Sequence, residues 1–243
     1  MPDGVATNGQ LQTAKAKWSL AMIVRNCADS LERCLKTIAA YPDEIVIVNT
    51  GVDESEPGFK ETSRVAESFG AKVFHFPWIE NFSAARNLSF QKCSNDVVMW
   101  LDSDDMVDNP MMLDRCIRQQ FGAGRIGVLY AEYLYAFDSI EFDGKKPVKW
   151  GTCTALLTRE RVVDRRSFEW RAPIHEVLCE NFRVVGSKIE PRIARIRHVH
   201  LHDEESQNGS LERNLRIIEY HYLPKEQGGL GEYCEERDRK SVV

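Results

Sequence analysis

Three carboxylates stand within four residues of this chain, directly after an apolar segment. The segment reads VVMWL (97–101), and Asp102, Ser103, Asp104 and Asp105 follow it. In an open α/β sheet, ligands bind at the carboxyl ends of the strands. Carboxylates are costly there unless they meet a cation, and hard oxygen ligands suit Mg²⁺ or Mn²⁺ bound to phosphates. We therefore interpret Asp102 and Asp104 as candidate metal ligands. A capped turn at a strand end is the alternative.

The elements that would carry these carboxylates alternate regularly in the first half of the chain. Apolar and β-branched runs predict strands, and the segments between them have helical periodicity. The strands are expected at 20–24, 44–50, 72–76 and 96–102, and the helices at 29–41, 60–69 and 82–91. Asp29 and Glu32 are spaced like a helix capping box. The alternation predicts a parallel sheet with helices on both faces.

The pattern becomes less regular after Pro110. A helix is expected at 111–121, and strands are expected near 128–137, 150–158, 182–185 and 193–199. A last helix at 210–222 would place four apolar residues on one face: Leu211, Leu215, Ile218 and Tyr222. We expect a mixed, partly antiparallel second half that completes the sheet and shapes an acceptor site.

Composition limits the domain organisation and the possible partners. The 243 residues are 43% hydrophobic with a net charge of −5, which argues against a globally basic nucleic-acid binder. Residues 1–16 are polar and without period, and we predict a disordered lead-in. Residues 17–223 would form one domain, with a nucleotide-binding half at 17–108 and an acceptor half at 109–223. Residues 224–243 would be a loose charged tail.

Seven scattered cysteines, none in a C-x-x-C pair, favour thiols in a reducing compartment over a disulfide framework. The chain shows no apolar core after a basic start and no run of 18 apolar residues. The sequence therefore predicts no signal peptide, no membrane span and a cytoplasmic location.

Five ordered pieces of the chain resemble family 2 glycosyltransferases of the GT-A fold. They are MIVRN (22–26), EIVIVNTG (44–51), GAKV (70–73), NFSAARN (81–87) and WLDSDD (100–105). Two later pieces, FEWRAPIHEV (168–177) and RNL (213–215), are similar to the branch that includes lipopolysaccharide-core and bacteriocin S-glycosyltransferases. The resemblance covers most of residues 18–220.

This resemblance implies a fold and an activity. The fold would be α/β, a GT-A Rossmann-like, mostly parallel sheet flanked by helices, with a mixed C-terminal acceptor half. The activity would be inverting transfer of a sugar from a nucleotide diphosphate donor, expected to be a UDP-sugar, with Mn²⁺ or Mg²⁺ as cofactor. The acceptor is left open among a glycan, a peptide and a modified nucleic acid.

The resemblance also implies donor-binding residues in the first half. Val24, Arg25 and Asn26 would line the nucleotide pocket, and Asn49 and Thr50 would face the base and ribose. The family usually has Asp at the position of Asn49, so the base preference is open. Arg86 would lie near the base and phosphates, with a helix-surface charge as the alternative. Asp102 and Ser103 would contact the donor, and Asp104 would be the direct metal ligand beside Asp102.

In the second half, Glu176 matches the position of the family's catalytic acidic residue. An inverting transfer needs a general base to deprotonate the acceptor, and Glu176 is the candidate, with a structural salt bridge as the alternative. His175 would orient Glu176 or touch the diphosphate. His198, His200 and His202 would share one face of a strand. His198 would complete the metal site, and a solvated strand face is the alternative. Trp170 is expected in the core.

Arginines cluster on either side of Glu176. They are Arg159, Arg161, Arg165, Arg166 and Arg171 before it, and Arg192, Arg195 and Arg197 after it. They would attract an anionic acceptor or pair with nearby carboxylates.

Two other functions are weighed against transfer. A sugar nucleotidyltransferase needs a Gly-rich loop after the first strand, and residues 25–29 hold no glycine. A catalytically inactive nucleotide-sugar-binding module is disfavoured by intact Asp102, Asp104 and Glu176.

Overall fold

The computed structural model describes residues 15–124, 126–199 and 204–223. His200, His202, the predicted tail and nearly all of the predicted lead-in lie outside the described residues. The helices are α1 (Ala28–Ile38), α2 (Phe59–Ser68), α3 (Phe82–Lys92), α4 (Pro110–Gly122) and α5 (Glu204–Tyr222). The strands are β1 (Trp18–Val24), β2 (Glu44–Asn49), β3 (Lys72–His75), β4 (Val97–Trp100), β5 (Asp105–Asp108), β6 (Val128–Phe137), β7 (Ile140–Asp143), β8 (Lys146–Trp150), β9 (Cys153–Asp164), β10 (Phe168–Arg171), β11 (Val177–Glu180), β12 (Gly186–Lys188) and β13 (Arg195–His198).

Within the described residues, nine of these strands form one twisted sheet in the order β3-β2-β1-β4-β9-β6-β13-β5, with β12 beside β6. The first four strands pair in parallel. β9 then runs antiparallel to β4 and β6, and β13 is parallel to β6 but antiparallel to β5. This arrangement confirms the expected GT-A Rossmann-like fold with a mixed second half. β7–β8 and β10–β11 are separate hairpins.

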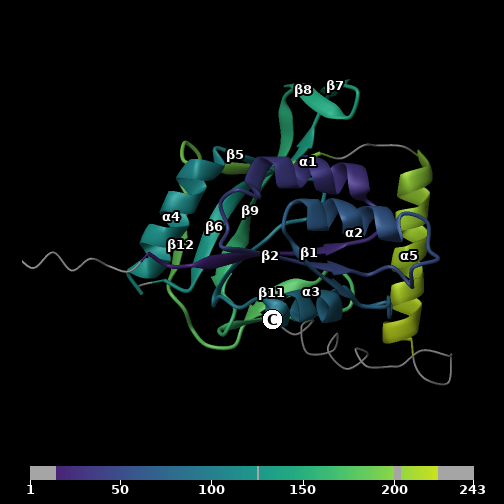
Figure 1. Ribbon diagram of the computed structural model, residues 1–243, viewed down its shortest axis with the longest axis horizontal. Coiled ribbons are helices and arrows are strands. Elements are labelled where there is room, and N and C mark those ends of the chain that lie inside the picture. The colour runs from purple at the N-terminus through teal and green to yellow at the C-terminus, as the bar shows by residue number, and fades with distance from the viewer. Residues whose placement is uncertain (1–14, 125, 200–203, 224–243) are drawn as a thin grey trace, which may run out of the picture.

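Both faces of the sheet are covered, as the apolar strands require (Figure 1). In β1, Leu20 and Met22 point into one core with Leu35 of α1 and Ile117 of α4. Ala21 points the other way, into a second core formed with α3 and the β10–β11 hairpin. Helices α1, α2 and α4 therefore lie on one face, and α3 lies on the other.

Two local predictions were wrong. Asp29 does not cap α1, because the helix begins at Ala28 with Cys27 as its N-cap and no side-chain cap. Asp29 sits in the first turn and forms an ion pair with Lys145 of the β7–β8 hairpin. Residues 182–185 form no strand but a connection between β11 and β12, in which Phe182 and Val185 are exposed. Strand propensity alone does not form a strand where no neighbour pairs with it.

Helix α5 starts earlier than predicted and buries a different face. Leu211, Leu215 and Ile218 are 62%, 58% and 40% exposed, whereas Ile217 and His221 are buried. The predicted apolar face was therefore wrong, because the helix packs against the loop at Glu80 through polar as well as apolar side chains. No helix in the described parts of the chain has the length and apolar character to cross a membrane.

The buried carboxylate of Glu44, at the start of β2, binds residues at or near the starts of β1, β3 and β4. These contacts make the free energy of unfolding depend on pH. It accepts hydrogen bonds from Ser19 Oγ (2.6 Å), Lys72 Nζ (2.7 Å) and the Ser94 backbone N–H (2.7 Å). Burial alone would raise the pKa of Glu44, but the bonds from Lys72, Ser19 and Ser94 lower it to about 2. The folded pKa lies below the unfolded value of 4.5, so this stability is present above that value and is lost as pH falls toward about 2.

We expect Glu44→Gln to lower the free energy of unfolding at neutral pH by on the order of 2 kcal/mol, because the exposed Lys72 end of the network is screened by solvent. The difference from wild type should shrink below about pH 4, where the wild-type carboxylate also loses its advantage. Urea unfolding across a pH series measures it. Glu61→Gln is the control, since Glu61 makes an exposed pair with Arg64. A difference that is constant with pH would contradict the prediction.

Candidate functional site

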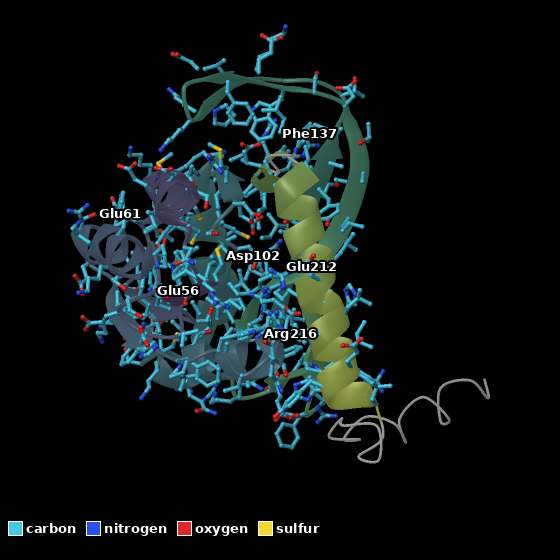
Figure 2. All side chains as sticks on the ribbon, turned by 90° about the vertical axis from the view of Figure 1, so that its right-hand side faces the viewer. Glu56, Glu61, Asp102, Phe137, Glu212 and Arg216 are labelled. Atoms are coloured by element: carbon cyan, nitrogen blue, oxygen red, sulfur yellow. The ribbon has the colours of Figure 1, made fainter. Side chains whose placement is uncertain are left out.

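A cleft of about 480 Å³ opens where β1, β2 and β4 end, at the edge where a parallel sheet binds its ligands. Figure 2 looks onto this end of the molecule, with Asp102 beside α5. The cleft brings together most of the residues proposed from the sequence: Val24, Arg25, Thr50, Arg86, Asp102, Ser103, Asp104, His175, Glu176 and His198. Asn26 and Asn49 are not among the residues that line it.

Strand pairing brings the acidic turn to His198. β5 begins at Asp105 and runs antiparallel to β13, and His198 is the register partner of Asp105. The backbone N–H of Val199 also donates to the carbonyl oxygen of Asp104 at 2.8 Å. As a result, ligand atoms of Asp104, Asp105 and His198 all lie within 4.8 Å of one another.

Asp105 is the fully buried member of this group. Its carboxylate accepts hydrogen bonds from the Tyr133 hydroxyl (2.9 Å), the Asp102 backbone N–H (3.0 Å) and Arg161 Nη1 (3.0 Å). Arg161 is 1% exposed, and its guanidinium carbon lies 3.9 Å from the centroid of the Trp100 ring. With both oxygens occupied in this way, Asp105 holds the turn that presents Asp102 and Asp104.

Sequence reasoning did not single out Asp105 or Tyr133 and placed Arg161 only within a basic cluster. A third carboxylate after the strand was a visible signal for Asp105. Its partners come from β6 and β9, so only the pairing of distant strands identifies them.

Tyr133 connects Asp105 to His198. Its hydroxyl donates to Asp105 Oδ1 at 2.9 Å, and its oxygen lies within hydrogen-bond distance of His198 Nδ1, at 3.0 Å. The same ring nitrogen, Nδ1, lies 3.6 Å from Asp104 Oδ1 and 3.7 Å from Asp105 Oδ1, so it is the imidazole atom that faces the acidic turn. The His198 ring also stacks on Tyr135 at 5.1 Å between centroids. The orientation of the histidine is therefore fixed by its neighbours.

Asp104 lines the cleft with its side chain about one third exposed, as does Asp102. Burial and the charges of Asp102 and Asp105 raise the pKa of Asp104 to about 6, against the opposing charge of His198. A group of carboxylate oxygens with one imidazole nitrogen is a donor set that fits Mn²⁺ or Mg²⁺. The residues present thus fit the expected cation.

Arg86 joins the acidic turn to the candidate base. Its Nε donates to Glu176 Oε1 at 2.7 Å, and its Nη2 donates to Asp102 Oδ1 at 2.8 Å. The guanidinium carbon lies 5.0 and 4.9 Å from the centroids of the Trp100 and Trp170 rings, which contact each other edge to face. Although burial opposes it, Arg86 lowers the pKa of Asp102. Arg86 is 8% exposed, so it is not an ordinary surface charge on a helix.

Helix α3, which carries Arg86, is fixed at its N-terminus and near its middle. Asn81 caps the helix by accepting from the Ala84 backbone N–H at 2.9 Å. Asn87 pairs with the backbone of Trp170 through two hydrogen bonds of 2.9 Å. Trp170 is buried, as expected.

After β10, the chain turns through His175, whose φ is +50°. Such left-handed backbone is uncommon for a non-glycine residue and clusters at functional sites. It precedes Glu176 at the cleft.

The turn after β1 is tied to the loop after β2. Glu56 accepts from Arg25 Nε (2.7 Å) and from Asn26 Nδ2 (2.6 Å). Asn49 is fully buried, where its amide donates to Phe59 O and Ser63 Oγ and accepts from Gly51 N–H. The structure therefore does not bring the Asn26 and Asn49 side chains into the cleft, whereas Thr50 lines it.

The clustered arginines are paired with carboxylates, which is the alternative that the sequence left open. The pairs are Arg159–Glu160, Arg161–Asp105, Arg165–Asp96, Arg166–Asp164, Arg171–Glu169, Arg192–Glu190, Arg195–Glu132 and Arg197–Asp108. These pairs remove the main reason to expect an anionic acceptor.

Parts of this chain are similar in sequence to known proteins. A TPR repeat-containing protein of Synechococcus elongatus is 37% identical over 95 residues, which are 39% of this chain and 22% of that protein. An uncharacterized glycosyltransferase of Rickettsia bellii is 28% identical over 89 residues, 37% of this chain and 28% of that protein. The chain thus matches less than a third of the length of either relative.

A solved structure of an S. aureus TarS fragment in complex with UDP has a TM-score of 0.41. It is 16% identical, and the match covers 52% of this chain and 38% of that one.

Residues 19–147 match the family model of glycosyl transferase family 2. This range is just over half of the chain, and it runs from β1 through the acidic turn to the β7–β8 hairpin. The chain belongs to glycosyl transferase family 2.

Proposed function

We propose that this protein is an inverting, metal-dependent glycosyltransferase that uses a nucleotide diphosphate sugar, with a UDP-sugar as the expected donor. The observation that carries the proposal is one cleft with two chemical sides. One is the pair of candidate metal ligands, Asp104 and His198. The other is Glu176, whose Oε1 lies 2.7 Å from Arg86 Nε. A cation site and a candidate base facing one space are what displacement of a diphosphate requires.

The reaction would be a single displacement. A nucleophilic hydroxyl or thiol of the acceptor attacks the anomeric carbon, and the bond from that carbon to the diphosphate oxygen breaks. Glu176 takes the proton that the acceptor loses, and the nucleoside diphosphate leaves with the bonding electron pair. Attack from the side opposite the leaving group inverts the anomeric configuration.

Asp104 and His198 would hold the Mn²⁺ or Mg²⁺, with Asp102 beside them. When bound, the cation supplies positive charge that offsets the charge of the leaving diphosphate. Arg86 would position Glu176 and Asp102, since it donates to both carboxylates. Val24, Arg25, Thr50 and Ser103 would contact the donor from the strand ends.

The acceptor is left as a glycan, a peptide or a modified nucleic acid, and the cytoplasmic location stays a prediction. The inactive binding module is the second candidate, because Arg86 already occupies Glu176 Oε1. Donor hydrolysis with Mn²⁺ separates the two candidates. A protein that binds the donor with Mn²⁺ but never cleaves it would be the binding module.

A thermal-shift panel of nucleotide sugars, each with and without Mn²⁺, tests the donor and the metal together. A ligand at about a hundredfold excess over its Kd stabilises the folded state by about 2.7 kcal/mol, which raises the Tm of a protein this size by about 5–10 °C. We expect that shift with UDP-sugars only when Mn²⁺ is present. A Tm that no nucleotide sugar changes would contradict the proposal.

A further inference from the structure

Helix α5 crosses the open end of the cleft and contributes a side chain to it (Figure 2). The helix is anchored at Glu80, where Arg216 forms a 2.9 Å ion pair and a ring nitrogen of His221 donates to the carbonyl oxygen at 2.8 Å. On the face toward the cleft, the Arg213 guanidinium lies over the Phe82 ring, 5.2 Å from its centroid. Arg213 therefore reaches the cleft from an element anchored outside it.

Arg213 differs from the other arginines that line the cleft. Arg25, Arg86, Arg159 and Arg161 each have a carboxylate oxygen within 3.3 Å. Among the residues that the structure describes, Arg213 has no carboxylate within 4.0 Å, and its only hydrogen bond goes to Asn214 Oδ1 at 3.2 Å. Its Nε is buried without a hydrogen-bond partner.

The surroundings of Arg213 do not satisfy its charge. Burial is the largest effect and lowers the pKa of Arg213. The charges of Arg216 and Arg25 add to this shift, and the charges of Glu80 and Glu176 oppose it without reversing it. The planar guanidinium is always charged and suits two-point hydrogen bonding to phosphate oxygens. Arg25 follows β1, at the strand ends where a nucleotide binds in this kind of sheet. A phosphate group in the cleft beside Arg213 would offset the charge of Arg213 and accept its hydrogen bonds.

We propose that Arg213 binds the diphosphate of the nucleotide donor, so that α5 forms one wall of the donor site. The proposal rests on the proposed function, since it requires a nucleoside diphosphate in this cleft. It excludes the acceptor as the partner of Arg213. It also means that the donor is held from two directions, by the strand ends and by a helix that follows the strand of His198.

Binding of UDP, GDP and uridine with Mn²⁺, measured by calorimetry on the full chain, tests this. Arg213→Ala should weaken binding of the nucleoside diphosphate about ten- to a hundredfold, the range for loss of a hydrogen bond to a charged group, and should leave uridine binding unchanged. Arg213→Lys keeps the charge without the planar fork and should lie between the two proteins. Leu215→Ala is the matched control, because Leu215 lies on the same helix, is 58% exposed and does not line the cleft.

The possible results distinguish a failure of the role proposed for Arg213 from a failure of the proposed glycosyltransferase function. If wild type binds the diphosphate and Arg213→Ala binds it equally well, the role of Arg213 is overturned and the function stands. Equal losses for the diphosphate and uridine, or the same loss in Leu215→Ala, would make Arg213 structural. A changed acceptor KM with unchanged diphosphate binding would place Arg213 on the acceptor side. A wild type that binds neither diphosphate overturns the proposed function itself.

Discussion

Asp104→Ala is expected to lower sugar transfer by roughly a thousandfold while the fold stays intact, which corresponds to about 4 kcal/mol of transition-state stabilisation. The cleft holds Asp104 with His198, and the two side chains approach to 3.6 Å. Loss of the carboxylate would remove a cleft-facing ligand that its neighbours cannot replace, because Asp102 pairs with Arg86 and Asp105 already accepts hydrogen bonds at both oxygens.

The fold should survive because Asp104 supports it through the backbone. Its carbonyl oxygen accepts from Val199 N–H, and alanine keeps that bond. Removal of the side chain also relieves repulsion among three carboxylates in one turn. The measurement is donor turnover with Mn²⁺ as a function of metal concentration, alongside thermal unfolding without metal.

Asp108→Ala is the matched control for Asp104→Ala. Asp108 is the last residue of strand β5, which begins directly after Asp104; it pairs with Arg197 at 2.8 Å and does not line the cleft. We expect this control to keep transfer close to wild type, although it loses one partly exposed ion pair. Folded Asp104→Ala protein with wild-type turnover would rule out the metal hypothesis for this cleft.

The strands and helices of the first half could be predicted from the sequence because their signals are local. β2 is a run of buried β-branched residues, and the expected 44–50 differs from Glu44–Asn49 by one residue. Strand β4 and the position of the acidic turn follow from the same kind of run. In parallel sheets the strands are buried on both faces, so local hydrophobicity and chain order are sufficient.

The second half could not be predicted as well because its contacts are distant in sequence. β5 is only four residues long, and it becomes a strand because β13 pairs with it. The buried Arg161 looks like a surface charge in the sequence, and only its pairing with Asp105 makes it a core residue. The buried face of helix α5 was predicted wrongly for a similar reason. The helix buries the face that contacts the loop at Glu80, and its apolar stripe stays exposed.

Candidate site residues were predicted best where a motif and a strand end coincide. Asp102, Asp104, Arg86, Glu176 and His198 do meet in one cleft. Asn49 matches the motif position but has its amide hydrogen bonds within the protein, where it holds the turn after β2. A motif therefore identifies the turn, whereas the direction of each side chain depends on contacts that the local sequence does not contain.

Glu176→Gln should keep donor binding and lose transfer by about a hundred- to ten-thousandfold, the range for removal of a general base. The amide preserves the size of the side chain, and its carbonyl oxygen can still accept from Arg86 Nε, so the Arg86–Asp102 contact and the shape of the donor side should be retained. What disappears is the oxygen able to take a proton from the acceptor.

Steady-state kcat and calorimetric donor affinity, measured on the same preparation, separate catalysis from binding in this variant. Glu169→Gln is the matched control, since Glu169 lies in the preceding strand β10 and makes an exposed pair with Arg171. If Glu176→Gln keeps its kcat but loses donor affinity, Glu176 serves only to hold Arg86. If instead kcat falls alone, Glu176 acts in the transfer step, as expected of a base.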